Sequence, residues 1–273
     1  MIPESPFPNE FLKTPLLRYH NTEMTWISSD CEDQYEKVKN KVPYSPNDVT
    51  YKFNNFGFRC DDFESWEKYP YRILFAGCSI TEGIGVPLED CWAKIFHKRL
   101  CENIGHNIPY WNIGKSATGF DQMLRYLYHF GDMLRPQIII SFLPDKSRRE
   151  ISNDMHWGTW WDVDPTLTKP LLKTFSNETI INYQTEKNLS MINFMLDRWN
   201  TEFLYLNVAI NKENLNYSNF YGFEICLHDF IIEGNYARDG IHPGKESNIN
   251  ISNLMFDNLW KKIETKLGLT NLK

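Results

Sequence analysis

The stretch ILFAGCSITEGIG, residues 73–85, joins a short apolar run to a sharp turn that carries a serine. The four apolar residues before Gly77 have the length and composition of a strand that is buried on both faces. The small residues after them allow the chain to turn directly into a helix. We therefore expect Ser79 at the carboxyl end of a parallel strand, with its hydroxyl facing solvent, where open α/β sheets bind their ligands.

Strands and helices alternate along the chain after residue 71. Short apolar runs predict buried strands at residues 72–76, 109–113, 137–143 and 202–209. Apolar residues at helical spacing predict helices at about residues 88–100, 120–134, 186–200 and 245–267. Strands separated by helices of this length imply right-handed crossovers. The sequence therefore predicts a three-layer α/β/α sandwich around a mostly parallel, flavodoxin-like sheet.

Residues 1–70 are poor in long apolar runs and rich in proline, so they predict an accessory arm that is mostly loop. A short helix is expected within residues 30–39, with Ser29 or Asp30 as its cap. The segment TYKFNNFGFR, residues 50–59, alternates well enough to be a strand or an extended arm. We expect its phenylalanines to dock this arm on the main body.

Composition limits the class of protein. With 273 residues, of which 42% are hydrophobic, the chain is long enough to bury a core. A net charge of −6 without a basic stripe argues against nucleic-acid binding. No run approaches the ~18 apolar residues of a membrane span, and the first residues lack a signal-peptide pattern. We expect a soluble, unprocessed protein, cytoplasmic by default, with release or association with a larger particle left open.

The six cysteines show no CxxC pair and no clustering with histidine, so neither a zinc site nor a disulfide framework is expected. A serine nucleophile needs a base, and the base needs an orienting acid. His242 lies in RDGIHPG, a loop bounded by glycine and proline, and Asp239 precedes it by three residues. This spacing can bring the carboxylate to Nδ1–H of the imidazole while Nε2 faces outward. A loop-stabilising Asx-turn is the alternative interpretation of Asp239.

Three motifs in this order resemble the SGNH (GDSL-type) hydrolases. They are GCSITEG at residues 77–83, NIGKSATG at residues 112–119 and DGIHP at residues 239–243, and NNFGFR at residues 54–59 looks like a lead-in found before some members. The resemblance covers about residues 71–267 and implies the SGNH hydrolase fold and a Ser–His–Asp ester hydrolase. Ser79 would be the nucleophile, His242 the general base and Asp239 its orienting acid.

The resemblance also implies two backbone donors for the oxyanion, the N–H groups of Ser79 and Gly114. Gly114 follows a predicted strand, and a glycine allows the backbone to approach a ligand closely. A glycine that serves only the turn is the alternative. Cys78 stands where the family normally has aspartate, so it is a rival nucleophile, although a buried small hydrophobe is the simpler interpretation.

The sequence departs more seriously from a further motif of the family, which lies between the second and the last of the three quoted above. After the predicted strand at residues 137–143, the family usually carries an asparagine that donates to the oxyanion, and here Asp145 occupies roughly that place. An ionised carboxylate has no proton to donate. Three interpretations stay open: Asp145 pairs with Arg148 or Arg149 and the guanidinium donates, Asn153 takes the place of the asparagine, or the oxyanion hole is incomplete.

The main domain, residues 71–273, contains a long insertion at about residues 144–185 with no clear period. A stretch of this length is typical of a lid or the wall of a binding site. It contains HWGTWW, with Trp157, Trp160 and Trp161. These rings could stack on a sugar, or they could pin the loop to the body.

The leading hypothesis is therefore an esterase that removes an O-acetyl or short acyl group from a carbohydrate or another small ester. It would need no metal or organic cofactor. A lipase-like esterase is a variant of the same chemistry. The alternative from another class is a catalytically weak or inactive carbohydrate-binding or structural module that keeps the fold. The oligomeric state is left open by the sequence.

Overall fold

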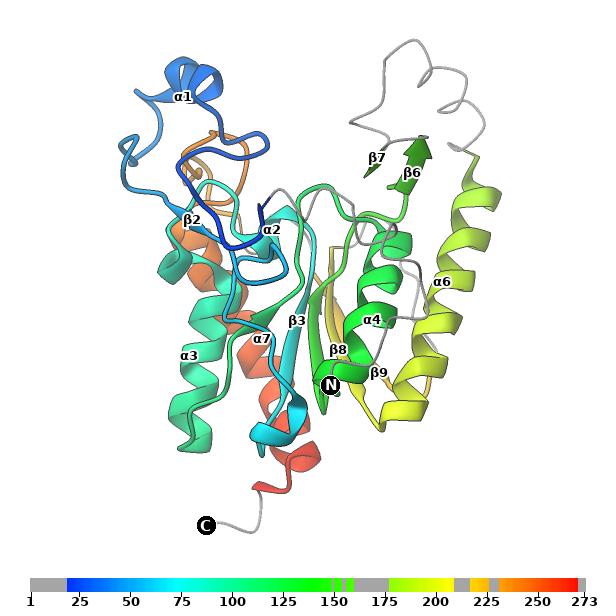
Figure 1. The fold of residues 1–273 in the computed structure, drawn as a ribbon. Coiled ribbons are helices and arrows are strands. Elements are labelled where there is room, and N and C mark those ends of the chain that lie inside the picture. Colours follow the sequence, from blue (N-terminus) through cyan, green and yellow to red (C-terminus); the bar gives the residue numbers. More distant parts are fainter. Residues whose placement is uncertain are drawn as a thin grey trace.

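A five-stranded parallel sheet lies at the centre of the molecule (Figure 1). The computed structural model describes residues 19–148, 150–153, 156–159, 177–208, 217–225 and 231–269. The strands are β3 (Ile73–Gly77), β4 (Trp111–Asn112), β5 (Ile138–Phe142), β8 (Glu202–Val208) and β9 (Phe220–Ile225), in the spatial order β4-β3-β5-β8-β9. Every neighbouring pair in this sheet is parallel, and Leu74 lies opposite both Trp111 and Ile139. This is the flavodoxin-like strand order.

Two helical layers cover the sheet, so the predicted three-layer architecture is confirmed (Figure 1). Helices α3 (Trp92–Ile104) and α7 (Lys245–Lys266) pack on one face, and α4 (Phe120–Leu134) and α6 (Glu178–Trp199) pack on the other. Because side chains alternate along a strand, Phe75 joins the cluster of α3 and α7, whereas Leu74 joins the cluster of α4 and α6. None of the helices in the described part combines the length and apolarity that crossing a bilayer requires.

The fifth strand, β9, is absent from the sequence-based expectation. Its sequence FYGFEI contains a glycine and exposes Tyr221, so it lacks the continuous apolar run of the other strands. Gly222 is required there by packing, because a Cβ atom would lie 2.4 Å from the carbonyl oxygen of Tyr205 on β8. An edge strand is half exposed, and its pattern is therefore weaker than that of a central parallel strand.

The long insertion is more regular than the sequence indicated. Strands β6 (Glu150–Asn153) and β7 (His156–Thr159) form an antiparallel hairpin. Helix α6 starts at Glu178, ahead of the predicted start near residue 186, and the Asn177 side chain caps it by accepting from the backbone N–H of Thr179. Its first turns leave side chains such as Tyr183 exposed. No apolar stripe marks that part of the helix, which explains the error.

The described part of the arm, from residue 19 onward, shares the core of the main body. Its short strands β1 (Glu23–Met24) and β2 (Tyr51–Lys52) pair antiparallel, and α1 (Glu32–Val38) follows β1. The 3₁₀ turn η3 (Trp66–Lys68) lies near the end of the arm, and a second one, η4 (Leu88–Asp90), lies in the main body. Phe53 and Phe58 are buried, as expected for a docked arm. The predicted helix cap is wrong: Cys31 is the N-cap of α1 and makes no side-chain bond there.

Gly77 is the residue that makes the turn after β3 possible. Its φ is +149°, and a Cβ atom would lie 2.3 Å from Thr81 Oγ1 and 2.6 Å from the Phe142 carbonyl oxygen. We expect Gly77→Ala to lower the free energy of unfolding by about 3 kcal/mol, through backbone strain and overpacking together. Gly105→Ala is the control, since Gly105 has φ +72° but no atom near its added Cβ. It should cost about 1 kcal/mol. Equal losses in urea unfolding would contradict the role of the close approach at Gly77.

Candidate active site

Ser79 lies at the carboxyl end of β3, as predicted, and is the first residue of the short helix α2 (Ser79–Glu82). The turn is closed by the N–H groups of Thr81 and Glu82, which both donate to the carbonyl oxygen of Cys78. The expectation that Ser79 faces solvent is wrong, because Ser79 is only 6% exposed and its hydroxyl bonds His242. Cys78 before it is 4% exposed. The N–H of Ser79, as the first residue of a helix, has no intrahelical acceptor. It is therefore available to a group at the end of the sheet.

The structure brings together the three side chains that the sequence singled out. His242 Nε2 lies 2.8 Å from Ser79 Oγ, and His242 Nδ1 lies 2.6 Å from Asp239 Oδ2. An ionised carboxylate can only accept, so Nδ1 carries the proton and donates it to Asp239. In the neutral ring Nε2 is then the acceptor for the Ser79 hydroxyl. This is the hydrogen-bond order that a serine nucleophile, its base and an orienting acid require.

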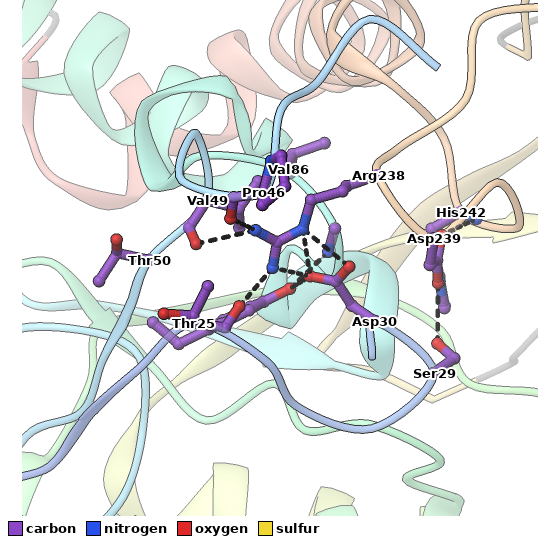
Figure 2. A network of polar contacts seen from close by, with 12 residues as sticks. Thr25, Ser29, Asp30, Pro46, Val49, Thr50, Val86, Arg238, Asp239 and His242 are labelled. Atoms are coloured by element: carbon purple, nitrogen blue, oxygen red, sulfur yellow. Dashed lines mark hydrogen bonds and ion pairs between the residues drawn. The ribbon is translucent and has the colours of Figure 1, made fainter. Parts of the chain in front are cut away.

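Asp239 contacts both its own loop and the imidazole, so the Asx-turn and the bond to His242 are present together. Its Oδ1 accepts from the backbone N–H groups of Ile241 and His242, each at 3.0 Å, which is an Asx-turn. Its Oδ2 accepts from His242 Nδ1 and also from Ser29 Oγ, at 2.8 Å (Figure 2). Burial alone would raise the pKa of Asp239. The hydrogen bond and charge of His242, with the two backbone N–H groups, outweigh it and lower the pKa below 3.8.

The lowered pKa predicts an acid-sensitive stability. A carboxyl group whose pKa is lower in the folded state adds stability above its ordinary pKa, and this is lost as the pH falls through the folded value. We expect Asp239→Asn to flatten the fall in unfolding free energy between about pH 5 and pH 3, because the variant has no carboxyl group to protonate there. Urea unfolding at stepped pH measures this slope. A slope equal to that of the wild type would contradict the lowered pKa of Asp239 in the folded protein.

A buried ion pair anchors the loop that carries Asp239 to the arm (Figure 2). Arg238 and Asp30 are both 0% exposed, and Arg238 Nη2 lies 2.6 Å from Asp30 Oδ2. The guanidinium also donates to the carbonyl oxygens of Thr25, Pro46 and Val49. Asp30 accepts a further bond from the Tyr51 hydroxyl at 2.5 Å. The arm and the loop are therefore held together by charge-assisted bonds that water cannot reach.

Ser29, Asp30 and Arg238 were not predicted as part of the site. Ser29 or Asp30 is expected from the sequence to cap α1, but their side chains bond Asp239 and Arg238 instead. These partners are more than 200 positions away in the chain. No local pattern in the sequence reports such a contact.

The Gly114 N–H has a partner within its own loop. It donates to Asn112 Oδ1 at 2.8 Å, so an oxyanion would have to compete with this bond. Packing also requires this glycine, because a Cβ atom would lie 2.8 Å from the Thr81 side chain on α2. These contacts support the alternative in which Gly114 serves only the turn. Its role as an oxyanion donor stays a prediction.

A second buried ion pair joins the loop after β4 to α2. Lys115 Nζ lies 2.5 Å from Glu82 Oε1, and Glu82 Oε2 accepts from the Ser116 N–H at 2.6 Å. Glu82 is 1% exposed, and the Lys115 ammonium lies over the rings of Tyr19 and Phe53. The pair holds the loop after β4 beside Ser79. The motifs in the sequence did not predict this contact.

Arg59, the last residue of NNFGFR, supports the segment that follows α2. Its guanidinium is buried and donates to the carbonyl oxygens of Gly83, at 2.5 Å, and of Val86 and Thr50, each at 3.0 Å. It also lies over the Tyr51 ring, at 4.4 Å from the centroid. The lead-in motif therefore supports the turn that carries Ser79.

In the loop after β5, Asp145 is held by a local contact with Ser147. The Asp145 carboxylate is exposed and accepts from the N–H and the hydroxyl of Ser147, at 2.7 and 2.6 Å. No ion pair joins it to Arg148 within the described ranges. Arg149 lies outside the described residues. The loop does reach the neighbouring one, because a Cβ atom on Gly119 would lie 2.5 Å from the Arg148 carbonyl oxygen.

The remaining predicted contacts fall where side chains are not described. Asn153 is the last residue of β6 and Trp157 lies on β7, and only their backbones are described. Trp160 and Trp161 lie outside the described residues. Within the part of the chain that the structure describes, no group of three or more His, Cys, Asp or Glu side chains could hold a metal ion.

Solved structures with a similar chain path include proteins named as esterases and lipases. They include the family 3 carbohydrate esterase of Clostridium thermocellum (13% identity, TM-score 0.49, covering 71% of this chain and 98% of that chain). A psychrotrophic esterase from Pseudoalteromonas sp. matches at 16% identity and TM-score 0.47, again covering 71% and 98%. A GDSL-like lipase from Bacteroides thetaiotaomicron matches at 14% identity and TM-score 0.38, covering 71% and 90%. No family model and no curated protein matches the chain.

Proposed function

We propose that this protein is a serine ester hydrolase of the SGNH type, with Ser79 as nucleophile, His242 as general base and Asp239 as the orienting acid. The observation that carries the proposal is the continuous chain of hydrogen bonds from Ser79 Oγ to His242 Nε2, at 2.8 Å, and from His242 Nδ1 to Asp239 Oδ2, at 2.6 Å. The loop and the helix that hold these groups are both braced by buried ion pairs.

The reaction would proceed through an acyl-enzyme. Ser79 Oγ attacks the ester carbonyl carbon while its proton passes to His242 Nε2, and Asp239 stabilises the imidazolium that forms. The tetrahedral intermediate collapses when the C–O bond to the alcohol breaks, and Nε2 returns the proton to that alcohol. Water then attacks the acyl carbon and gives a proton to His242 Nε2. The second tetrahedral intermediate collapses when its bond to Ser79 Oγ breaks, and Nε2 returns the proton to Ser79 as the acid leaves.

Charge on the intermediate needs donors at the end of the sheet. The Ser79 N–H is one candidate, and the Gly114 N–H is a second if it exchanges Asn112 for the oxyanion. Asp145 cannot donate when ionised. An arginine at 148 or 149, or Asn153, would have to supply the third bond. Removing one such donor typically costs about 100- to 1000-fold in rate.

As substrate we propose an O-acetyl or short-chain acyl ester of a carbohydrate or a comparably small alcohol. The support for the sugar is Trp157, Trp160 and Trp161 in the insertion, since flat aromatic faces suit sugar rings. A longer acyl chain, as in a lipase, is the variant that a chain-length series of esters separates from this one.

A second candidate is a binding module with weak or no catalysis. Two observations favour it: the Gly114 N–H donates to Asn112, and Asp145 occupies roughly the place where the family usually carries an asparagine. Ser79 is nevertheless within hydrogen-bonding distance of the imidazole, which a module would not need.

A fluorophosphonate probe, followed by mapping of the labelled peptide, tests the proposal without knowledge of the substrate. We expect a covalent adduct on Ser79 and hydrolysis of p-nitrophenyl acetate in preference to longer chains. Acetylated sugars offered in parallel test the substrate class. A folded wild type that takes no label on Ser79 and hydrolyses none of these esters would favour the binding module.

A further inference from the structure

The arm supplies a side chain to the orienting acid. Ser29 Oγ donates to Asp239 Oδ2 at 2.8 Å, and this is the oxygen that accepts from His242 Nδ1 (Figure 2). The Asp239 carboxylate is 0% exposed, so water does not satisfy this oxygen. Among the residues that the structure describes, this carboxylate is bonded by two backbone N–H groups, the imidazole and the Ser29 hydroxyl. Of these groups, the Ser29 hydroxyl comes from outside the loop of residues 239–242.

The place of Ser29 is held firmly by its neighbours. Asp30, the next residue, is locked to Arg238, which in turn directly precedes Asp239. Ile27 and Asp30 bond each other through both backbone groups, at 2.9 and 3.0 Å, which closes a tight turn around Ser28 and Ser29. Gln34 Nε2 on α1 adds a bond to the Asp239 carbonyl oxygen at 3.0 Å. These contacts hold the part of the arm that carries Ser29 against the loop that carries Asp239.

A hydroxyl donor on the shared oxygen has a chemical consequence for the site. A hydrogen bond donated to a carboxylate favours its ionised form and fixes its orientation. Of the charged groups near Asp239, His242 bonds it directly, whereas Arg238 and Asp30 are paired with each other. Loss of the Ser29 hydroxyl would therefore let Asp239 take up a proton at a higher pH and would loosen its hold on the imidazole.

We propose that Ser29 is a positioning residue of the catalytic machinery, supplied by the N-terminal arm, which extends the Ser79–His242–Asp239 chain to a fourth side chain. This inference rests on the proposed function, because it assigns Ser29 a role in activating Ser79. It also gives the arm a task beyond covering the core: the site is complete only when Ser29 and Asp30 are docked on the loop of residues 238–242.

The test compares Ser29→Ala with Ser29→Thr, which keeps the hydroxyl, and with Ser28→Ala. Ser28 is the matched control, since it is an exposed neighbour whose hydroxyl bonds Ser116 Oγ and not Asp239. The readout is the second-order rate of fluorophosphonate labelling of Ser79 across pH. For Ser29→Ala we expect a rate about tenfold lower, the size of one charge-assisted hydrogen bond. The acid side of its pH profile should move to higher pH.

Ser29→Thr should restore labelling to within about twofold of the wild type, and Ser28→Ala should label like the wild type. A merely structural role of Ser29 would lower the melting temperature but leave the pH profile in place, and that result would overturn the inference while the proposed function stands. If the wild type takes no label on Ser79, the proposed function fails instead. The low-field ¹H signal of the His242 Nδ1 proton then decides about Ser29: a shift in Ser29→Ala supports the contact, and an unchanged signal overturns it.

Discussion

Alanine at position 79 is expected to lower the rate of ester hydrolysis by about a million-fold, the size of the loss when a serine nucleophile of this type is removed. The hydroxyl bonded to His242 Nε2 is the group that would form the acyl-enzyme, and no other side chain is described as bonding that nitrogen. A residual rate about 10³-fold above that in water is expected to persist through binding and backbone donors. Initial rates on p-nitrophenyl acetate and probe labelling measure both.

Cys78→Ala is the matched control for Ser79→Ala. Cys78 is buried beside Ser79, and as the N-cap of α2 it makes no side-chain bond to the helix. If Cys78 only fills space, its alanine variant keeps most of the activity and the label stays on residue 79. A protein that loses activity with Cys78→Ala and keeps it with Ser79→Ala would have cysteine as its nucleophile, and the proposed roles would be wrong.

Arg238→Met is expected to lower the free energy of unfolding by about 3–5 kcal/mol. Removing one partner of a buried ion pair leaves the other charge, here Asp30, without compensation. The carbonyl oxygens of Pro46 and Val49 would also lose their donor. Because Arg238 directly precedes Asp239, we expect the variant to lose activity beyond its loss of stability. Urea unfolding gives the first effect, and probe labelling below the unfolding transition gives the second.

Arg198→Met is the control for this loss, since the pair of Arg198 with Asp132 spans 3.5 Å and both side chains are largely exposed. It should change stability by less than about 1 kcal/mol. Adding Asp30→Asn to Arg238→Met should recover part of the loss, because no buried charge is then left unpaired. Additive effects of the two substitutions would show that Asp30 and Arg238 do not act as a pair.

Much of the fold could be predicted because its signal is local. The buried strand before Gly77 and the apolar stripes of α4 and α7 follow from the residues of each element alone. Two of the elements that the sequence did not predict were missed for the same reason. β9 and the start of α6 are half exposed, and a half-exposed element carries too few apolar residues for its period to be recognised.

In the site, too, a contact within one loop could be predicted, whereas contacts between the arm and that loop could not. Asp239 and His242 share one loop, so their spacing was enough to predict the contact between them. The Gly114 N–H was assigned to the oxyanion, but its bond to Asn112 depends on a side-chain rotamer that the motif does not report. For Ser29 and Asp30, the local pattern indicated a helix cap, and tertiary partners displaced that role.

The sequence by itself determined the layers of the sheet and helices and the location of Ser79 at a strand end, because burial patterns and turn residues act over a few positions. Only the tertiary structure decided that the arm reaches Asp239 through Ser29 and locks Arg238 through Asp30. Those contacts join segments more than 200 positions apart. They form because buried charges and hydroxyls must find partners wherever packing brings one within reach.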